Sequence, residues 1–179
     1  MMQRHSHRSS GRCGFTLVET GLAIIIVATS MLAMVAAHEA FVQQNQWGER
    51  ASQAARLGAE IRERSMVLAV SDPVTGTATW GIEAGEGTIF DWDDMDDFDG
   101  LDVSGYGGDG PIDASGSVIP AMDGWRQVVA VQSVDPTNLA IIMPDGMAEA
   151  VRVTVDVFWQ ESAIDPGDLV TTVTWVHMQ

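Results

Sequence analysis

The sequence predicts an α+β protein in which one long N-terminal helix packs on an antiparallel β-sheet made by the last third of the chain. Three observations predict this fold class. Residues 20–37 are apolar and carry no charge or proline, residues 38–70 are rich in helix-forming side chains, and residues 125–178 contain β-branched runs separated by turn signals. These patterns are typical of a helix of two chemically different halves followed by short strands.

The apolar run comes first in the chain. Between Phe15 and Ala37 there are 23 residues, of which Glu19 is the only charged one. About 20 apolar residues in a helix span a bilayer, so residues 15–37 are predicted to be a transmembrane helix. Three arginines precede it, and basic residues stay on the cytoplasmic side. Residues 1–14 are therefore interpreted as a cytoplasmic leader, and the part after the span as exported.

The helix is expected to continue beyond the membrane. Residues 38–70 contain no proline and are rich in alanine, glutamine, glutamate and arginine, all of which favour helix. The residues Ser71-Asp72-Pro73 are a stop signal, so the helix is predicted to run from 15 to 70. This gives an exported half of the long helix within residues 38–72 and a globular α+β head within residues 73–179.

The last third of the chain is predicted to form a sheet. Alternation along one segment is regular over nine residues, which is typical of a strand with one buried face. We expect that face to pack on the exported half of the helix. The predicted strands are 125–134, 139–143, 151–159 and 169–178, and the alternating valines are Val151, Val153, Val155 and Val157.

Composition limits the function. The chain has 9 basic residues, all arginine, against 25 acidic ones, and its net charge is −16. Such acidity argues against nucleic acid, which needs a basic surface. Cys13 is the only cysteine and lies in the leader, so no disulfide is expected in the exported part.

The N-terminal motif is Gly14-Phe15-Thr16-Leu17-Val18-Glu19, placed between a basic leader and a membrane-length apolar run. It resembles the prepilin peptidase site of type IV pilins and pseudopilins. The resemblance implies a type IV pilin-like fold, cleavage between Gly14 and Phe15, and N-methylation of Phe15. It also implies that Glu19 pairs with the N-terminal amine of a neighbouring subunit during assembly. The alternative is that Glu19 simply reaches the membrane interface.

Two other kinds of N-terminus are compatible with a basic leader and an apolar run. A secretory signal would be cleaved after the apolar run, where Ala36-Ala37-His38 is a weak site. A lipoprotein signal would need its cysteine after the run, but Cys13 precedes it. All three interpretations place the C-terminal part outside the cytoplasm, and only the pilin interpretation keeps the apolar helix on the mature protein.

An acidic segment lies between helix and sheet. Seven of the twelve residues from Asp91 to Asp102 are aspartate. Clustered carboxylates on flexible loops favour calcium, although the EF-hand spacing is absent. The alternative is a solvated acidic turn whose apolar residues enter the core. The predicted calcium ligands are Asp93, Asp94, Asp96, Asp97 and Asp99.

The same segment carries a second resemblance. Residues 90–100, a following Gly-Trp pair at 124–125 and residues 131–136 resemble the head of minor pilins of the MSHA (mannose-sensitive haemagglutinin) biogenesis type. Those heads carry an Asp-Asp-x-Asp-Asp-aromatic-x-Gly segment. The matching residues here are Asp93, Asp94, Asp96, Asp97, Phe98 and Gly100.

Together these features lead us to expect a minor pilin or pseudopilin rather than an enzyme. After removal of the leader, only His38 and His177 remain as histidines and no cysteine remains, so no nucleophile–base pair is expected. The implied partners are prepilin peptidase, other pilin or pseudopilin subunits, the inner-membrane assembly platform and membrane lipid. The implied location is the bacterial inner membrane, single pass, with a periplasmic head, and then the pilus or pseudopilus.

Three alternatives remain open. The protein could be a type II secretion pseudopilin, which the sequence does not separate from a pilus subunit. It could be a membrane-tethered, calcium-dependent adhesin or binding module, an interpretation that rests on the acidic segment. An extracytoplasmic enzyme on a single anchor is the third, and it lacks candidate catalytic residues.

Overall fold

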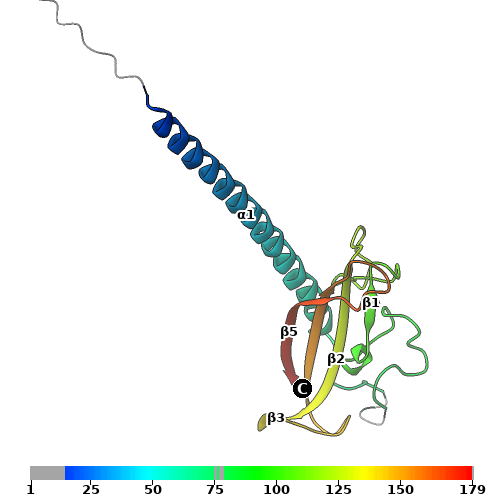
Figure 1. Cartoon of the computed structure of the whole chain (residues 1–179). Coiled ribbons are helices and arrows are strands. Elements are labelled where there is room, and N and C mark those ends of the chain that lie inside the picture. The colour runs from blue at the N-terminus through cyan, green and yellow to red at the C-terminus, as the bar shows by residue number, and fades with distance from the viewer. Residues whose placement is uncertain (1–14, 75, 77–78, 179) are drawn as a thin grey trace, which may run out of the picture. The chain divides into compact units, whose positions relative to one another are not determined.

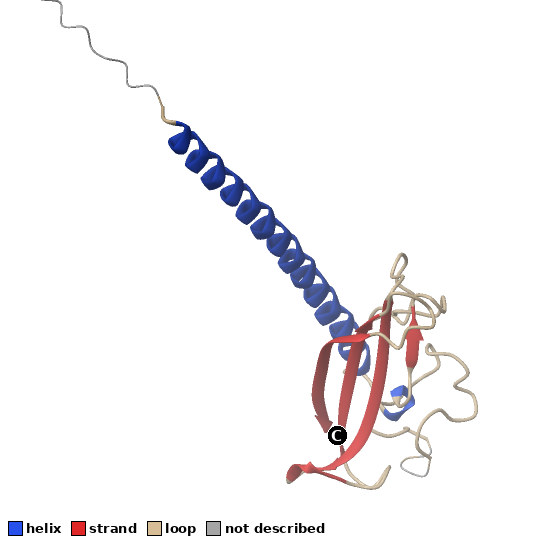
Figure 2. Ribbon diagram, viewed as in Figure 1, coloured by secondary structure: helices blue, strands red, loops and turns tan. Residues whose placement is uncertain are grey.

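The computed structural model describes residues 15–74, 76 and 79–178. It confirms the α+β, pilin-like architecture of a long N-terminal helix and a C-terminal antiparallel sheet (Figures 1 and 2). The chain divides into two compact units, Met1–Gln46 and Trp47–Gln179, and the second unit contains the sheet. The elements are α1 (Leu17–Ser65), the 3-10 turn η1 (Asp96–Phe98), β1 (Asp102–Ser104), β2 (Trp125–Asp135), β3 (Asn138–Ile142), β4 (Ala150–Trp159) and β5 (Asp168–Met178).

The helix α1 ends at Ser65, so the predicted end at Val70 was wrong. Two contacts explain the difference. The hydroxyl of Ser65 donates a hydrogen bond to the carbonyl of Arg62 (3.1 Å), an arrangement that competes with the helical backbone. Beyond it, the carbonyl of Ala69 accepts a hydrogen bond from the backbone N–H of Met95 (3.0 Å). Tertiary pairing with the acidic segment therefore replaces the last turn of helix.

The five strands form one sheet in the order β1-β2-β4-β5, with β3 paired to β2, and every pairing is antiparallel. The central pair is β2 with β4, in which Val129 lies opposite Val155 and Val131 opposite Val153. This register places the valine face of β4 beside the buried residues of β2. All four predicted strands are therefore present, with bounds within one residue of those expected.

The core lies between this valine face and the C-terminal part of α1. Ala54, Leu57 and Ile61 of the helix are fully buried and belong to one cluster with the β2 and β4 valines. Their spacing of three and four residues puts them on one side of the helix. The prediction that the valine face packs on the helix is thus confirmed.

One glycine sets how closely helix and sheet approach. A Cβ atom built on Gly58 would lie 2.5 Å from Cγ2 of Val173 in β5. No side chain fits at that distance, so only glycine lets the helix backbone approach the strand this closely. Gly48, ten residues earlier in the same helix, has nothing within 4 Å of a built Cβ.

A buried amide joins helix, sheet and loop. Gln127 of β2 is fully buried. Its Nε2 donates to the carbonyls of Leu57 (2.9 Å) and Ile112 (3.2 Å), and its Oε1 accepts from the backbone N–H of Ile112 (2.8 Å). Buried polar groups are tolerated when every donor and acceptor is paired, and this side chain meets that condition.

Candidate functional site

The first candidate site is the N-terminal turn of α1. Glu19 lies in this turn, and its Oε2 accepts hydrogen bonds from the backbone N–H (3.2 Å) and the hydroxyl (3.3 Å) of Thr16. In return, the backbone N–H of Glu19 donates to the Thr16 hydroxyl oxygen (3.3 Å). This reciprocal pattern is a capping box. Gly14 and the rest of the leader lie outside the described residues.

The capping box gives Glu19 a local role that the sequence analysis did not identify. The signal was present, because Thr16-Leu17-Val18-Glu19 is a Thr-x-x-Glu motif before an apolar run. The carboxylate also lies at the positive end of the helix dipole. Glu19 therefore has both a local partner and an exposed position from which it can reach another molecule.

The helix after this turn is chemically suited to lipid. Among the described residues, α1 is the one helix long and apolar enough to cross a membrane, and its most apolar 18-residue window is not buried at all. Large apolar side chains such as Leu22, Ile25 and Met34 are exposed to solvent. In a water-soluble unit these side chains would be covered, so the exposed surface is that of a membrane anchor or signal.

The second candidate site is the acidic segment around η1. Asp94, Asp96 and Asp97 are all buried, with exposed fractions of 4% or less. Oδ1 of Asp94 accepts from the backbone N–H groups of Asp96 (3.1 Å) and Asp97 (3.3 Å), while Oδ2 of Asp97 accepts from those of Asp93 (3.1 Å) and Asp94 (3.4 Å). These bonds fold the segment into a tight turn on its own carboxylates.

Two further aspartates fasten the turn to the rest of the head. Oδ2 of Asp96 accepts from the backbone N–H of Gly81 (3.1 Å). Asp99 bridges two segments: its Oδ1 accepts from the backbone N–H of Val131 in β2 (2.8 Å), and its Oδ2 accepts from the indole N–H of Trp80 (3.3 Å). Both aspartates, which the sequence predicts as metal ligands, therefore also accept hydrogen bonds from other parts of the head.

Burial perturbs the acid–base behaviour of the turn. Burial, together with the neighbouring Asp96, raises the pKa of Asp94 to about 8. Burial and the charge of Asp94 raise the pKa of Asp97 to about 7. Burial also raises the pKa of Asp96. Removing a carboxylate from water and placing others beside it both disfavour the charged form.

The structure brings carboxylates together in a different set from the one predicted. Asp72, Glu86 and Asp93 form one group, and Glu83, Glu86 and Asp97 form a second. Within each group, one oxygen from every residue lies within 4.8 Å of the others. Two of the predicted ligands, Asp93 and Asp97, belong to these groups. The other members are Asp72, Glu83 and Glu86, which precede the acidic segment in the chain. Their spacing in the sequence does not indicate that they meet.

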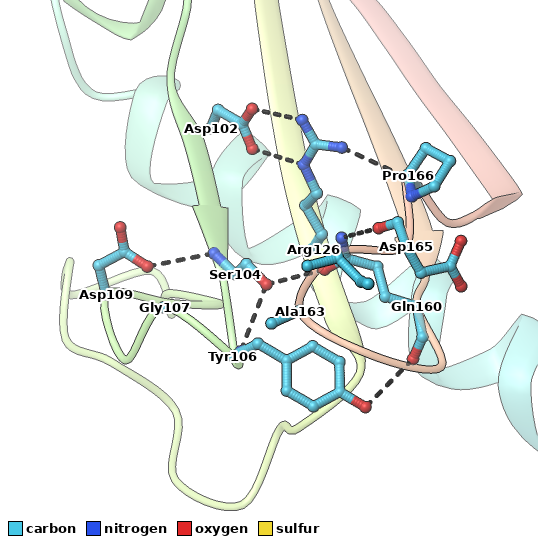
Figure 3. Close-up of a pocket in the computed structure, with 11 residues that line it drawn as sticks. Asp102, Ser104, Tyr106, Gly107, Asp109, Arg126, Gln160, Ala163, Asp165 and Pro166 are labelled. Carbon is cyan, nitrogen blue, oxygen red and sulfur yellow. Dashed lines mark hydrogen bonds and ion pairs between the residues drawn. The ribbon is translucent and has the colours of Figure 1, made fainter.

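A surface pocket of about 460 Å³ lies at the end of β1 and β2 (Figure 3). Arg126 and Asp102 face each other across it in a two-pronged ion pair, with Nε 2.6 Å from Oδ1. Gln160 accepts from the Ser104 hydroxyl (2.8 Å) and donates to the carbonyl of Asp165 (2.6 Å). The polar groups bond one another across the pocket, so they join the loops together rather than present a ligand site.

Comparison of the chain with protein-family models, with curated proteins and with solved structures finds no match.

Proposed function

We propose that the protein is a minor pilin or pseudopilin, a structural subunit that primes or decorates a type IV pilus-type filament. Prepilin peptidase would cut between Gly14 and Phe15, and the new N-terminal amine of Phe15 would be methylated. The mature helix would remain in the bacterial inner membrane with its head in the periplasm. The assembly platform would then move the subunit into the filament. No enzymatic activity is proposed.

The observation that carries the proposal is the single carboxylate at the start of a membrane-length helix that leads into a pilin-like head. Glu19 is the fifth residue after the proposed cleavage site and the only charged side chain between Phe15 and Ala37. An unpaired charge in a bilayer costs a few kcal/mol. The positive amine of Phe15 on a neighbouring subunit would neutralise it and would fix the register between two helices.

The capping box makes a sharper test possible than removal of the side chain alone. Glu19→Ala removes both the cap and the charge, while Glu19→Gln removes the charge but keeps an amide that can occupy the same capping position. Glu39→Gln, in the same helix beyond the apolar run, is the matched control for loss of one negative charge. Each variant should replace the native chain in its own host.

Two quantities decide the outcome. The first is cleavage and methylation, measured by mass spectrometry of the peptide that begins at Phe15. The second is the ratio of subunit in sheared filaments to subunit in membranes. We expect all variants to be cleaved, and both Glu19 variants to lose filament incorporation by about tenfold or more. Normal incorporation of Glu19→Gln would refute pairing with the amine and leave the capping box as the role of Glu19.

The same measurement separates the pilus from the secretion system. Methylated Phe15 in sheared filaments supports a pilus component, whereas methylated Phe15 found only in membranes supports a type II secretion pseudopilin or an assembly primer. A chain that begins at Met1 or near His38 in both fractions would overturn the proposal.

A further inference from the structure

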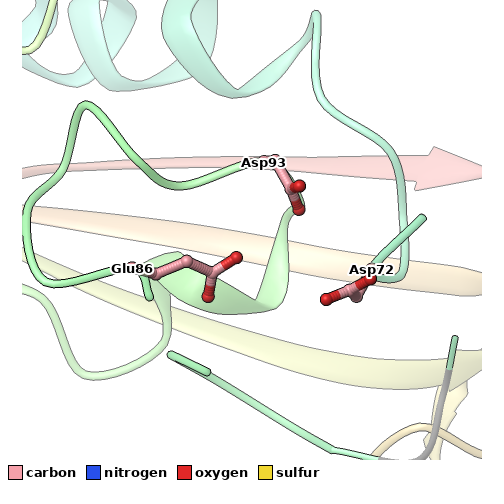
Figure 4. Close-up of side chains that lie close together, drawn as sticks. All are labelled: Asp72, Glu86 and Asp93. Carbon is pink, nitrogen blue, oxygen red and sulfur yellow. The ribbon is translucent and has the colours of Figure 1, made fainter. Parts of the chain in front are cut away.

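Two groups of carboxylates converge in the head. Three successive segments between α1 and β1 contribute to them: the loop after α1 with Asp72, the turn with Glu83 and Glu86, and the acidic segment with Asp93 and Asp97. Figure 4 shows the carboxylates of Asp72, Glu86 and Asp93 converging from these three segments. Glu86 belongs to both groups and therefore joins them.

One buried oxygen of Asp97 has no hydrogen-bond partner. Asp97 is 1% exposed. Its Oδ2 accepts two backbone hydrogen bonds, but its Oδ1 is buried and has no hydrogen-bond partner. A buried acceptor that bonds neither protein nor water is rare in folded proteins, and a buried carboxylate is normally paired with a cation or bound to a metal.

The arginines of the described residues do not pair with three of these carboxylates. Within the described parts of the chain, the one side-chain ion pair given by the geometry joins Arg126 to Asp102, and no arginine pairs with Glu86, Asp93 or Asp97. Two other arginines of the head are engaged with aromatic rings, Arg50 over Trp159 and Arg64 over Phe90. The sequence contains no lysine that could take the place.

We propose that the head binds Ca²⁺ at a site centred on Glu86, with Asp72, Glu83, Asp93 and Asp97 as the surrounding carboxylate ligands. The donor set consists of oxygen alone, as a hard cation requires. Two oxygens that are each about 2.4 Å from one ion lie at most about 4.8 Å apart, and both groups meet this limit without rearrangement.

The irregular loops favour calcium over magnesium. Calcium accepts six to eight oxygens in flexible geometry, while magnesium requires a near-ideal octahedron and keeps several of its waters. The ligands here come from three loops and include glutamates, which can bind through both oxygens. The proposal does not rest on the pilin assignment, because every ligand lies in the head.

A bound ion would fasten the region between α1 and β1. Asp72 follows the helix by a few residues, and Asp93 and Asp97 precede β1. The ion would replace repulsion among the carboxylates by attraction to a common centre. It would also hold the loop that carries Gly81 and Glu83 against the acidic turn, which already contacts β2 through Asp99.

The test uses the full chain, purified in detergent and freed of metal with a chelator. Calorimetric titration with CaCl₂ should give saturable heat for about one ion per chain. Thermal unfolding should shift upward by several degrees in millimolar Ca²⁺ and much less in the same concentration of Mg²⁺. Absence of saturable heat at 10 mM Ca²⁺ would overturn the proposal, as would an equal shift with both ions.

Substitutions locate the site. Glu86→Gln should weaken Ca²⁺ binding at least tenfold, and without calcium it should unfold at the same or a higher temperature because it relieves repulsion. That readout shows that loss of binding does not come from misfolding. Glu149→Gln, an exposed acid outside the cluster, is the matched control and should bind like the wild type. Equal affinity of Glu86→Gln and the wild type would refute the assignment.

Discussion

The close approach of α1 to β5 predicts that Gly58→Ala destabilises the head although alanine is the better helix former. In the middle of a helix, alanine is favoured over glycine by about 1 kcal/mol. Against this, the new methyl group would lie 2.5 Å from Cγ2 and 3.1 Å from Cβ of Val173. Both neighbouring atoms belong to a short, stiff side chain, so the contact is relieved only when the helix or the strand shifts.

The expected magnitude follows from these two opposing effects. Overpacking a well-filled core costs about 1–3 kcal/mol, which exceeds the gain in helix propensity in most of that range. We therefore expect Gly58→Ala to lower the free energy of unfolding by about 1 kcal/mol. Gly48→Ala gains the same propensity with nothing within 4 Å of its methyl group, so it should be neutral or stabilising. The difference between the two variants isolates the steric cost.

The assay is thermal unfolding of the full chain in detergent, followed by tryptophan fluorescence. Gly58→Ala should unfold several degrees below Gly48→Ala. Combining Gly58→Ala with Val173→Ala should recover about 1 kcal/mol relative to the sum of the single effects, because residues in contact do not contribute independently. Equal stability of the two glycine variants, or no coupling to Val173, would refute the argument that this contact fixes the helix on the sheet.

Three other perturbations test separate parts of the head. Gln127→Leu should cost about 2–4 kcal/mol in chemical denaturation, because it leaves both backbone groups of Ile112 buried without a partner. In chelator, stability should fall as pH rises from about 4 to 8. The folded-state pKa values of Asp94 and Asp97 lie above the ordinary value of 3.8, so the folded protein holds protons that the unfolded chain releases. A thermal midpoint that rises over this pH range would contradict the assignment of these raised pKa values. Asp102→Asn should cost less than about 1 kcal/mol, because its ion pair is partly exposed. A larger loss in denaturant titration would show a stronger structural role.

The sequence was most informative where one pattern repeats over many residues. The nine-residue alternation around Val153 defined both the strand and its buried face, because a period of two has a single interpretation at that length. The uncharged run before residue 38 predicted the apolar half of the helix for the same reason. Both features are local, and tertiary contacts did not alter them.

The features that sequence reasoning missed depend on contacts between distant segments. The helix ends at Ser65 because the acidic segment binds the backbone of Ala69. The roles of Gln127 and Gly58 exist only once helix and sheet face each other. The carboxylate groups around Glu86 combine residues from three loops. The spacing of those residues along the chain does not predict that they meet.

The contact between Gly58 and Val173 also bears on when the head can fold. The two residues lie near opposite ends of the unit Trp47–Gln179, and β5 completes both the sheet and the cover over the helix. Folds built on such distant pairings form slowly, because the entropy cost of closing a long loop comes before any stabilising contact forms. In a chain that lacks β5, one edge of β4 has no partner strand and Gly58 has no Val173 against it. Under the proposed export across the membrane, β5 would arrive last, so the head would complete its fold only after translocation ends.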